Sequence, residues 1–218
     1  MFFASQQLGI MKDEGVHVNF GFVSLPEGRM STRAGRIIFL DDLINETVNE
    51  AEKTIEEKNP RLKNKKAVAE MVGLAAIKYN DLSRDRIKDI VFDWKEALSF
   101  EGDTGPYLQY TCVRAASILR KSKKKPKIKS FTLDKNEADL IKILSKFPVV
   151  VQTAARDYKP HYIANYLNGL ASKFNEYYHN TKIISSNHES QRLAIVFSVL
   201  TVMKTGLNLL GIDVPEKM

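Results

Sequence analysis

The sequence predicts a mainly α-helical protein whose second half is a helical bundle. Apolar residues recur every three or four positions over most of the chain after residue 40, the spacing that lines one face of an α-helix. Strand-like patterns are confined to two short segments, 16–23 and 36–40. Of the 218 residues, 44% are hydrophobic and 27% are charged, which are ordinary values for a globular protein with a core.

The first region, residues 1–40, is short and strand-like. The segment VHVNFGFV at 16–23 alternates apolar and polar side chains, and RIIFL at 36–40 is a second compact apolar run. A basic loop, GRMSTRAGR at 28–36, lies between them. Two strands and one loop cannot form an independent sheet, so we expect this region to be the edge of a larger domain.

The second region, residues 41–105, is predicted to be a helical connector. Apolar residues at helical spacing predict one helix over about 40–55 and another over about 68–79. The segment 82–100 has a mixed pattern and is assigned to neither helix nor strand. EGDTGP at 101–106 is rich in turn-forming residues and marks the expected domain boundary.

The third region, residues 106–218, is helical throughout. Its apolar stripes cover 108–119, 140–147 (ended by Pro148), 162–178 and 193–210. Four or five amphipathic helices joined by short loops are typical of a helical bundle.

The net charge of +7 favours polyanionic partners such as RNA without requiring one. The densest positive segment is KSKKKPKIK at 121–129, with six lysines in nine residues. It could hold an RNA backbone, but a solvated loop between two bundle helices is the simpler interpretation. In either case its attraction for phosphate would be nonspecific and sensitive to salt.

Cys112 is the single cysteine, which excludes an internal disulfide and suits a reducing cytosol. The first residues are apolar but lack a basic leader, and no later apolar run is expected to reach the roughly 18–20 residues that span a bilayer. The sequence therefore predicts a cytoplasmic protein without a membrane partner.

The basic loop combines glycines, arginines and hydroxyls. Such a loop can surround an anion with side-chain cations, hydroxyl donors and free backbone N–H groups. Taken alone, the pattern is also consistent with a basic turn between two strands. The residues are Gly28, Arg29, Ser31, Thr32, Arg33, Gly35 and Arg36.

Three segments, in order along the chain, resemble the C-terminal part of arginyl-tRNA synthetase, a class I aminoacyl-tRNA ligase. They are VSLPEGRMSTRAGRIIFLDDL, LSRDRIKDIVFDWKEALSFEGDTGPYLQYT and LLGIDVPEKM. The resemblance implies three parts: 1–40 as the C-terminal edge of a Rossmann-like catalytic domain, 41–105 as a helical connector, and 106–218 as an α-helical anticodon-binding domain.

The basic loop is similar to the KMSKS loop of class I enzymes, which closes over the phosphates of ATP. The matching string is Arg29, Met30, Ser31, Thr32 and Arg33. The resemblance implies that these residues bind ATP, with Arg29, Ser31 and Arg33 acting in catalysis. Arginine in place of the first lysine keeps the charge and adds a fork suited to phosphate. Thr32 and Arg33 depart from the motif and leave open which arginine of the loop contacts phosphate.

The class also needs a HIGH motif, in which two histidines three positions apart hold ATP. No two of the four histidines here have that spacing, so we expect the chain alone not to activate arginine. The four histidines and the single cysteine are dispersed along the chain and offer no dense cluster of metal ligands. No metal site is therefore predicted. The complete enzyme would join arginine to tRNA(Arg) with ATP and Mg²⁺.

The third region also carries side chains suited to RNA, whose sequence is usually read on unstacked bases that stack on aromatic rings. By pattern alone, tyrosines at helical spacing are more often core residues. GPYLQYTCVRAASILRK and FNEYYHN, however, are similar to segments of the family's anticodon-binding domain. The resemblance implies that Tyr110, Tyr178 and Met218 approach the anticodon loop, and Arg114 follows Tyr110 by one helical turn. These four are the predicted RNA-binding residues.

We therefore expect the C-terminal part of an arginine–tRNA ligase, which binds tRNA(Arg) through its anticodon region and supplies the loop for the ATP phosphates. Two alternatives remain open. One is a stand-alone tRNA-binding module without ligase activity. The other is a helical interaction protein that kept the fold without the function, in which case Tyr110 and Tyr178 would be buried rather than facing a common groove.

Overall fold

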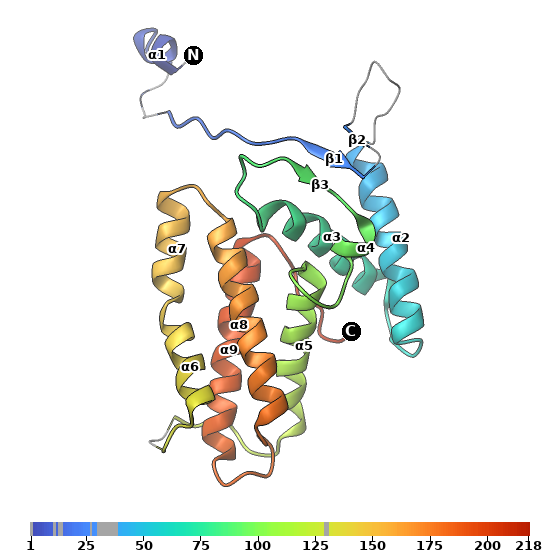
Figure 1. Ribbon diagram of the computed structural model, residues 1–218, viewed down its shortest axis with the longest axis vertical. Helices are drawn as coiled ribbons and strands as arrows, with labels where there is room; N and C mark the ends of the chain where they lie inside the picture. Colours follow the sequence, from blue (N-terminus) through green and yellow to red (C-terminus); the bar gives the residue numbers. More distant parts are fainter. Residues whose placement is uncertain (1, 11, 13–14, 27, 30–38, 129–130) are drawn as a thin grey trace.

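A computed structural model of the chain describes residues 2–10, 12, 15–26, 28–29, 39–128 and 131–218. Helices dominate, and a small sheet lies at one end (Figure 1), so the predicted mainly α fold is confirmed. The helices are α1 (Phe2–Gln7), α2 (Leu40–Lys58), α3 (Lys65–Leu82), α4 (Trp94–Ala97), α5 (Gly105–Lys121), α6 (Lys135–Ser145), α7 (Phe147–Arg156), α8 (His161–Asn180) and α9 (Glu189–Leu209). The strands are β1 (Val23–Leu25), β2 (Gly28–Arg29) and β3 (Ile90–Val91).

Helices α5 to α9 form the predicted bundle (Figure 1). Their apolar stripes meet in one core, whose fully buried members include Leu108, Leu140, Leu167 and Leu193. Pro148 follows the end of the second stripe as predicted, but a further helix, α7, begins at Phe147. Proline is tolerated in a first helical turn because the N–H that it lacks would have no partner there.

Helix α9 corrects one expectation. This 21-residue helix contains an 18-residue window with a mean hydropathy of 1.4, so by length and composition it could cross a membrane. The expectation that no later apolar run is so long was wrong. In the fold α9 packs against α5, α6 and α8, and Val196, Met203 and Leu207 lie in the bundle core. A helix with neighbours on several sides is apolar around most of its circumference, which accounts for this composition.

A second, smaller core lies between α2 and α3, where Ala51 and Ile55 are buried. The other face of α3 packs on the bundle, since Ala75 and Tyr79 belong to the bundle core. Tyr79 Oη also lies 3.3 Å from the carbonyl oxygen of Ala164 on α8. Helix α3 therefore joins the α2–α3 layer to the bundle.

The sheet has the order β2–β1–β3, antiparallel between β1 and β2 and parallel between β1 and β3. Strand β3 and helix α4 both come from the segment 82–100, which the sequence left unassigned. Only the first two residues of β1, Val23 and Ser24, pair with β3.

The strand predicted at 16–23 was wrong in its position, because within it only Val23 belongs to the sheet. The described backbone before it is held by isolated hydrogen bonds, such as Gly21 N to Arg86 O at 2.7 Å. Of the segment 36–40, residues 36–38 lie outside the described residues, and Leu40 begins α2 instead of ending a strand.

The lysine-rich segment beyond Lys121 lies between α5 and α6, in agreement with the simpler interpretation. Its residues 123–128 are exposed. It contacts the bundle at the start of α9. Ser122 Oγ donates to Glu189 Oε1 at 2.7 Å, and Lys124 Nζ lies 3.4 Å from Glu189 Oε2. Lys127 N donates to the carbonyl of Ser190 at 2.9 Å.

Candidate nucleic-acid interface

Helices α5 and α8 bring three predicted RNA-binding side chains together. Tyr110 and Arg114 lie one turn apart on the same face of α5, as their spacing of four predicts. Tyr178 lies in the last turn of α8. The guanidinium carbon of Arg114 lies 4.8 Å from the ring centre of Tyr110 and 5.1 Å from that of Tyr178. These are cation–π distances, so Arg114 contacts both rings.

Asn175 sets the orientation of Arg114. Its Oδ1 accepts a hydrogen bond from Arg114 Nη1 at 2.7 Å. Its Nδ2 donates to Tyr107 Oη at 2.9 Å and to Thr111 Oγ1 at 3.2 Å. Arg114 Nη2 also donates to Tyr110 Oη at 3.3 Å. Both polar atoms of the Asn175 amide therefore have partners, and the guanidinium is held in one orientation.

Two adjoining hollows open around this cluster, and both include Tyr110 and Arg114 in their walls. The tyrosine hollow, of about 530 Å³, is lined by Tyr110, Val113, Arg114, Ser117, Lys121, Tyr178, Lys182 and their neighbours. The methionine hollow, of about 600 Å³, is lined by Lys58, Asn59, Phe100, Glu101, Tyr107, Tyr110, Arg114, Asn175, His179 and Met218, together with Ile55.

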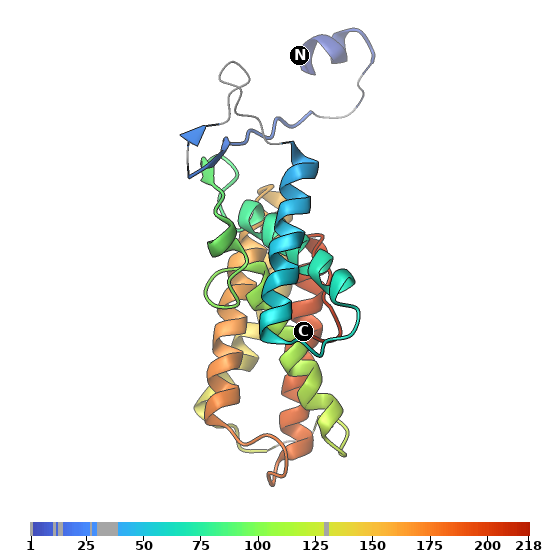
Figure 2. The same cartoon turned by 90° about the vertical axis from the view of Figure 1, so that its right-hand side faces the viewer.

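Met218 reaches the methionine hollow because the segment after α9 turns back toward α2 (Figure 2). Leu210 and Ile212 anchor this segment in the bundle core. Met218 itself packs against the α2–α3 core, and its carbonyl oxygen accepts a hydrogen bond from Asn59 Nδ2 at 3.1 Å. The four predicted RNA-binding residues therefore meet at one place, although they come from three separate segments.

The two tyrosine rings are accessible. Tyr110 is 38% exposed and Tyr178 is 39% exposed, whereas Tyr177, next in the chain to Tyr178, is fully buried. The interpretation as an inert helical protein required both rings to be buried, and they are not. They line the tyrosine hollow together.

The charges at these hollows are mainly positive. Arg114, Lys121 and Lys182 line the tyrosine hollow without a carboxylate among its lining residues. Lys58 lies at the methionine hollow, with its Nζ 5.0 Å from the ring centre of Phe100, and Glu101 is the acidic lining residue there. Positive charge beside accessible aromatic rings suits an anionic polymer that also presents flat apolar faces.

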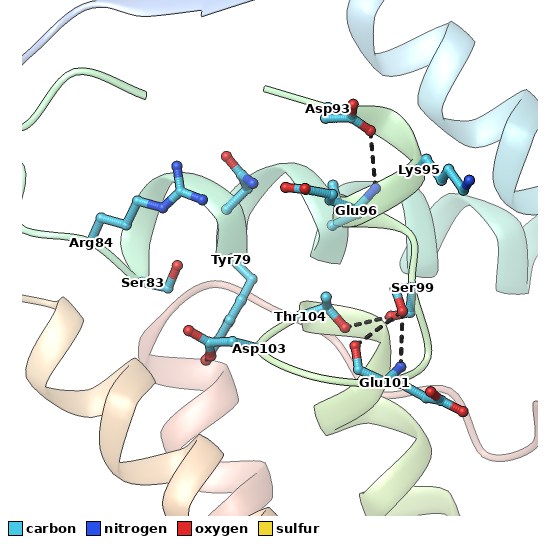
Figure 3. A pocket seen from close by; sticks show the side chains of 13 residues that line it. Tyr79, Ser83, Arg84, Asp93, Lys95, Glu96, Ser99, Glu101, Asp103 and Thr104 are labelled. Carbon is cyan, nitrogen blue, oxygen red and sulfur yellow. Dashed lines mark hydrogen bonds between the residues drawn. The ribbon is translucent and has the colours of Figure 1, made fainter. Parts of the chain in front are cut away.

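A third hollow, between α3, α4 and the turn before α5, differs in charge (Figure 3). Tyr79 Oη donates to Asp103 Oδ1 in its wall, and Thr104 Oγ1 bonds to the carbonyl of Ser99. Burial, followed by this carboxylate, raises the pKa of Tyr79 well above its usual range. The charged lining residues are Asp93, Glu96, Glu101, Asp103, Arg84 and Lys95. With more acids than bases, this hollow is unsuited to an RNA backbone.

The predicted phosphate loop is described only at its start. Gly28 and Arg29 form β2, which pairs with β1. Met30, Ser31, Thr32, Arg33 and Arg36 lie outside the described residues. Among the residues that the structure describes, no group of three or more histidine, cysteine, aspartate or glutamate side chains is placed to hold a metal ion.

Sequence reasoning did not predict the contribution of the α2–α3 layer to this interface. Lys58 and Asn59 at the end of α2, and Phe100 before α5, line the methionine hollow. The ring of Phe100 lies 6.4 Å from that of Tyr110 in an edge-on arrangement. No local pattern marks these residues, because they reach the site only through the packing of α2 and α3 on α5.

Two protein-family comparisons together match nearly the whole chain. Residues 108–218 match the DALR anticodon binding domain, and residues 1–94 match the catalytic domain of class I (R) tRNA synthetases. The fold and its aromatic, basic site therefore define part of a class I aminoacyl-tRNA synthetase with an anticodon-binding domain.

Individual relatives narrow this class. The arginine–tRNA ligase of Halothermothrix orenii is 47% identical over 93% of this chain and 37% of its own length. Arginine–tRNA ligase 1 of Bacillus thuringiensis is 44% identical over 98% of the chain and 38% of its own length. Among solved structures, Thermus thermophilus arginyl-tRNA synthetase matches with a TM-score of 0.85 and 36% identity, over 91% of this chain and 35% of that one.

The chain belongs to the arginyl-tRNA synthetase family, as the resemblance in its sequence implied. It spans a little over a third of the length of the curated relatives that it matches.

Proposed function

We propose that this chain supplies the tRNA-reading part of an arginine–tRNA ligase and binds the anticodon loop of tRNA(Arg) at the tyrosine and methionine hollows. The observation that carries the proposal is the Arg114 guanidinium in contact with two accessible tyrosine rings, beside the hollow that Met218 lines. Membership of the family and the match to an anticodon-binding domain support it.

Each side chain has a separate role in this proposal. The rings of Tyr110 and Tyr178 offer faces on which unstacked bases can stack, each stack contributing about 1–3 kcal/mol. Arg114 is held in its orientation by Asn175 and Tyr110, and the remaining N–H groups of its guanidinium can donate to base edges or phosphate. Met218 forms an apolar wall for a base placed in the neighbouring hollow.

We further propose that the complete ligase uses ATP and Mg²⁺ to join arginine to tRNA(Arg) in the cytoplasm. Arg29, Ser31 and Arg33, with Met30 and Thr32 between them, would contact the ATP phosphates. Cations there stabilise the negative charge that develops on the leaving pyrophosphate. The test is the rate of arginine-dependent ATP–pyrophosphate exchange by the complete protein. If the protein is a ligase, replacing Arg29 and Arg33 by alanine should lower this rate. A stand-alone binding module would have no such exchange for the substitution to change.

The test of the binding proposal is equilibrium binding of the chain to tRNA(Arg), to the same tRNA with an altered anticodon and to an unrelated tRNA, at several salt concentrations. We expect a preference for the native anticodon that persists at higher salt, because stacking and base-edge contacts do not depend on counterion release. Equal, salt-sensitive binding to all three RNAs would contradict the proposal.

The variant that isolates the site is Tyr178→Ala. Loss of one stacking face should weaken binding to tRNA(Arg) by about 5- to 150-fold, which corresponds to 1–3 kcal/mol, and should remove most of the anticodon preference. Tyr178→Phe, which keeps the ring, should retain both. Phe197→Ala is the matched control, since Phe197 is an exposed ring on α9 that lines neither hollow.

A further inference from the structure

Beside the tyrosine and methionine hollows lies a further hollow, of about 680 Å³, between the α2–α3 loop, α5 and the C-terminal segment. We call this hollow the basic cradle, because its lining includes the basic residues Arg61, Lys63, Arg120 and Lys217. We propose that the basic cradle binds the phosphodiester backbone of the same RNA arm whose loop is read at the tyrosine and methionine hollows. This inference rests on the proposed function.

The cradle is continuous with both RNA hollows. It shares Asn59 and Met218 with the methionine hollow and Val113 and Ser117 with the tyrosine hollow. On α5, the positions 110, 113, 114, 117 and 120 recur at helical spacing, so one face of this helix borders the tyrosine hollow, the methionine hollow and the basic cradle. An RNA strand with a base stacked at Tyr110 therefore has its adjoining backbone within reach of the cradle.

The charge of the cradle suits phosphate. Its lining contains four basic residues and a single acidic one, Glu216. Within the described part of the chain, none of the four takes part in an ion pair, and all four are exposed. Lys65, next to the cradle, differs because it pairs with Glu56. The hollow in Figure 3 shows that the net positive charge of the protein does not make every hollow basic.

The cradle is built from a loop in a defined position. Leu62 packs against the α2–α3 core, between the two basic residues of the loop. Asn59 binds the carbonyl of Met218 at 3.1 Å, and Asn64 takes a left-handed backbone conformation with φ of 59° just before α3. On the other side, Arg120 Nη1 lies 3.4 Å from the carbonyl of Glu216. The backbone of the loop that bears Arg61 and Lys63 therefore has a defined position relative to Arg120 and the C-terminal segment.

The cradle crosses the boundary between the two matched families. Arg61 and Lys63 lie in the part that matches the catalytic domain, and Arg120 and Lys217 in the part that matches the anticodon-binding domain. An RNA backbone bound here would contact both parts at once. Because phosphate is the same in every nucleotide, these contacts position the arm and add affinity without reading sequence.

The experiment compares the 218-residue chain with the double variant Arg61→Ala/Lys63→Ala. These two side chains make no hydrogen bond or ion pair with the described residues, so their removal spares Leu62, Asn59 and the fold. The matched control is Lys142→Ala/Lys146→Ala, which removes the same charge from two exposed residues at the α6–α7 junction, outside all three hollows.

The probes are an RNA hairpin with the anticodon arm of tRNA(Arg) and the same hairpin with an altered anticodon, each across a salt series. The cradle variant should bind both hairpins about tenfold more weakly, with the slope of log K against log salt smaller by about 1–2. The ratio of the two affinities should stay as in the unchanged chain. The control variant should keep the original slope.

Two results would overturn the proposal. One is a slope in the cradle variant equal to that of the control. The other is competition by polyglutamate as strong as that by single-stranded RNA of equal charge, which would make the cradle a general polyanion surface. Failure of the proposed function looks different: the unchanged chain would then show no preference between the hairpins, and Tyr178→Ala would change neither affinity.

Discussion

At the residue scale, Asn175 connects the half-buried Arg114 to two side chains of the bundle. Its amide accepts from the guanidinium on one side and donates to Tyr107 and Thr111 on the other. An amide can do both at once because it carries a donor and an acceptor, which neither a carboxylate nor a hydrocarbon provides.

We predict that Asn175→Ala lowers both stability and RNA selectivity. The hydroxyls of the buried Thr111 and the half-buried Tyr107 each lose a hydrogen bond, which should lower the free energy of unfolding by about 1–2 kcal/mol. Arg114 becomes free to rotate, so the anticodon preference should fall by about fivefold while the salt slope stays unchanged. Urea unfolding and hairpin binding measure the two effects.

Asn165→Ala is the control for this prediction, since Asn165 is an exposed residue of the same helix. Asn175→Asp should keep more of the selectivity than Asn175→Ala, because the carboxylate still accepts from Arg114. Unchanged selectivity in Asn175→Ala would contradict the positioning role of the amide.

Tyr177 and Tyr178 show what could be predicted for single residues. Helical spacing puts adjacent residues about 100° apart, so only one of the two can face the solvent, but a sequence of two tyrosines does not indicate which. The resemblance indicated Tyr178. The structure buries Tyr177, whose hydroxyl lies 3.5 Å from Glu137 Oε1, and burial raises the pKa of Tyr177.

At the scale of elements, the crossing of α5 over α3 sets the position of Tyr110 and Arg114. It depends on Gly105, the first residue of α5. A Cβ at this position would lie 2.3 Å from the carbonyl oxygen of Ala75 on α3. Because that atom belongs to a helix backbone, it cannot move aside without moving α3.

We predict that Gly105→Ala lowers the free energy of unfolding by about 1–3 kcal/mol through overpacking. The displaced start of α5 should also weaken RNA binding. Gly169→Ala is the matched test, since Gly169 lies in α8 with no atom within 4 Å of its added Cβ. That change should stabilise the protein by about 0.5–1 kcal/mol. Equal effects of the two substitutions in urea unfolding would contradict the close approach.

The elements differ in how far the sequence predicted them. The long helices were predicted because their hydrogen bonds and apolar stripes are local. The strand at 16–23 was misplaced because a strand requires a partner, and the partner of β1 comes from Ile90 and Val91, more than sixty residues further along. The alternation at 16–23 describes an extended chain, but it cannot show which of its residues pair.

At the scale of the whole molecule, one cluster of contacts joins the segment before β3 to the bundle. Asp85 pairs with Lys159 at 3.0 Å, in the turn between α7 and α8, and Arg86 Nη1 donates to the carbonyl of Tyr158 at 2.8 Å. The hydrogen bond from Lys159 is the main cause that lowers the pKa of Asp85 below its usual 3.8.

This contact predicts an acid-dependent stability. Because the folded pKa of Asp85 is below the unfolded one, its contribution is present above about pH 5 and is lost as pH falls below about 4. The free energy of unfolding should therefore fall less steeply between pH 5 and 2 in Asp85→Asn than in the unchanged chain. Glu57→Gln, which alters an exposed acid of α2, is the control. Identical pH profiles for Asp85→Asn and the unchanged chain would contradict the prediction.

The sequence by itself determined the mainly helical fold and the family, because helical periodicity and contiguous motifs are properties of neighbouring residues. It also indicated Tyr110, Arg114, Tyr178 and Met218 as candidates. The tertiary structure alone decided that these residues meet, that Asn175 orients Arg114, and that the basic cradle joins the α2–α3 loop to α5 and the C-terminal segment. Such contacts link residues up to about 160 positions apart, as Asn59 and Met218 show, and depend on how whole helices pack.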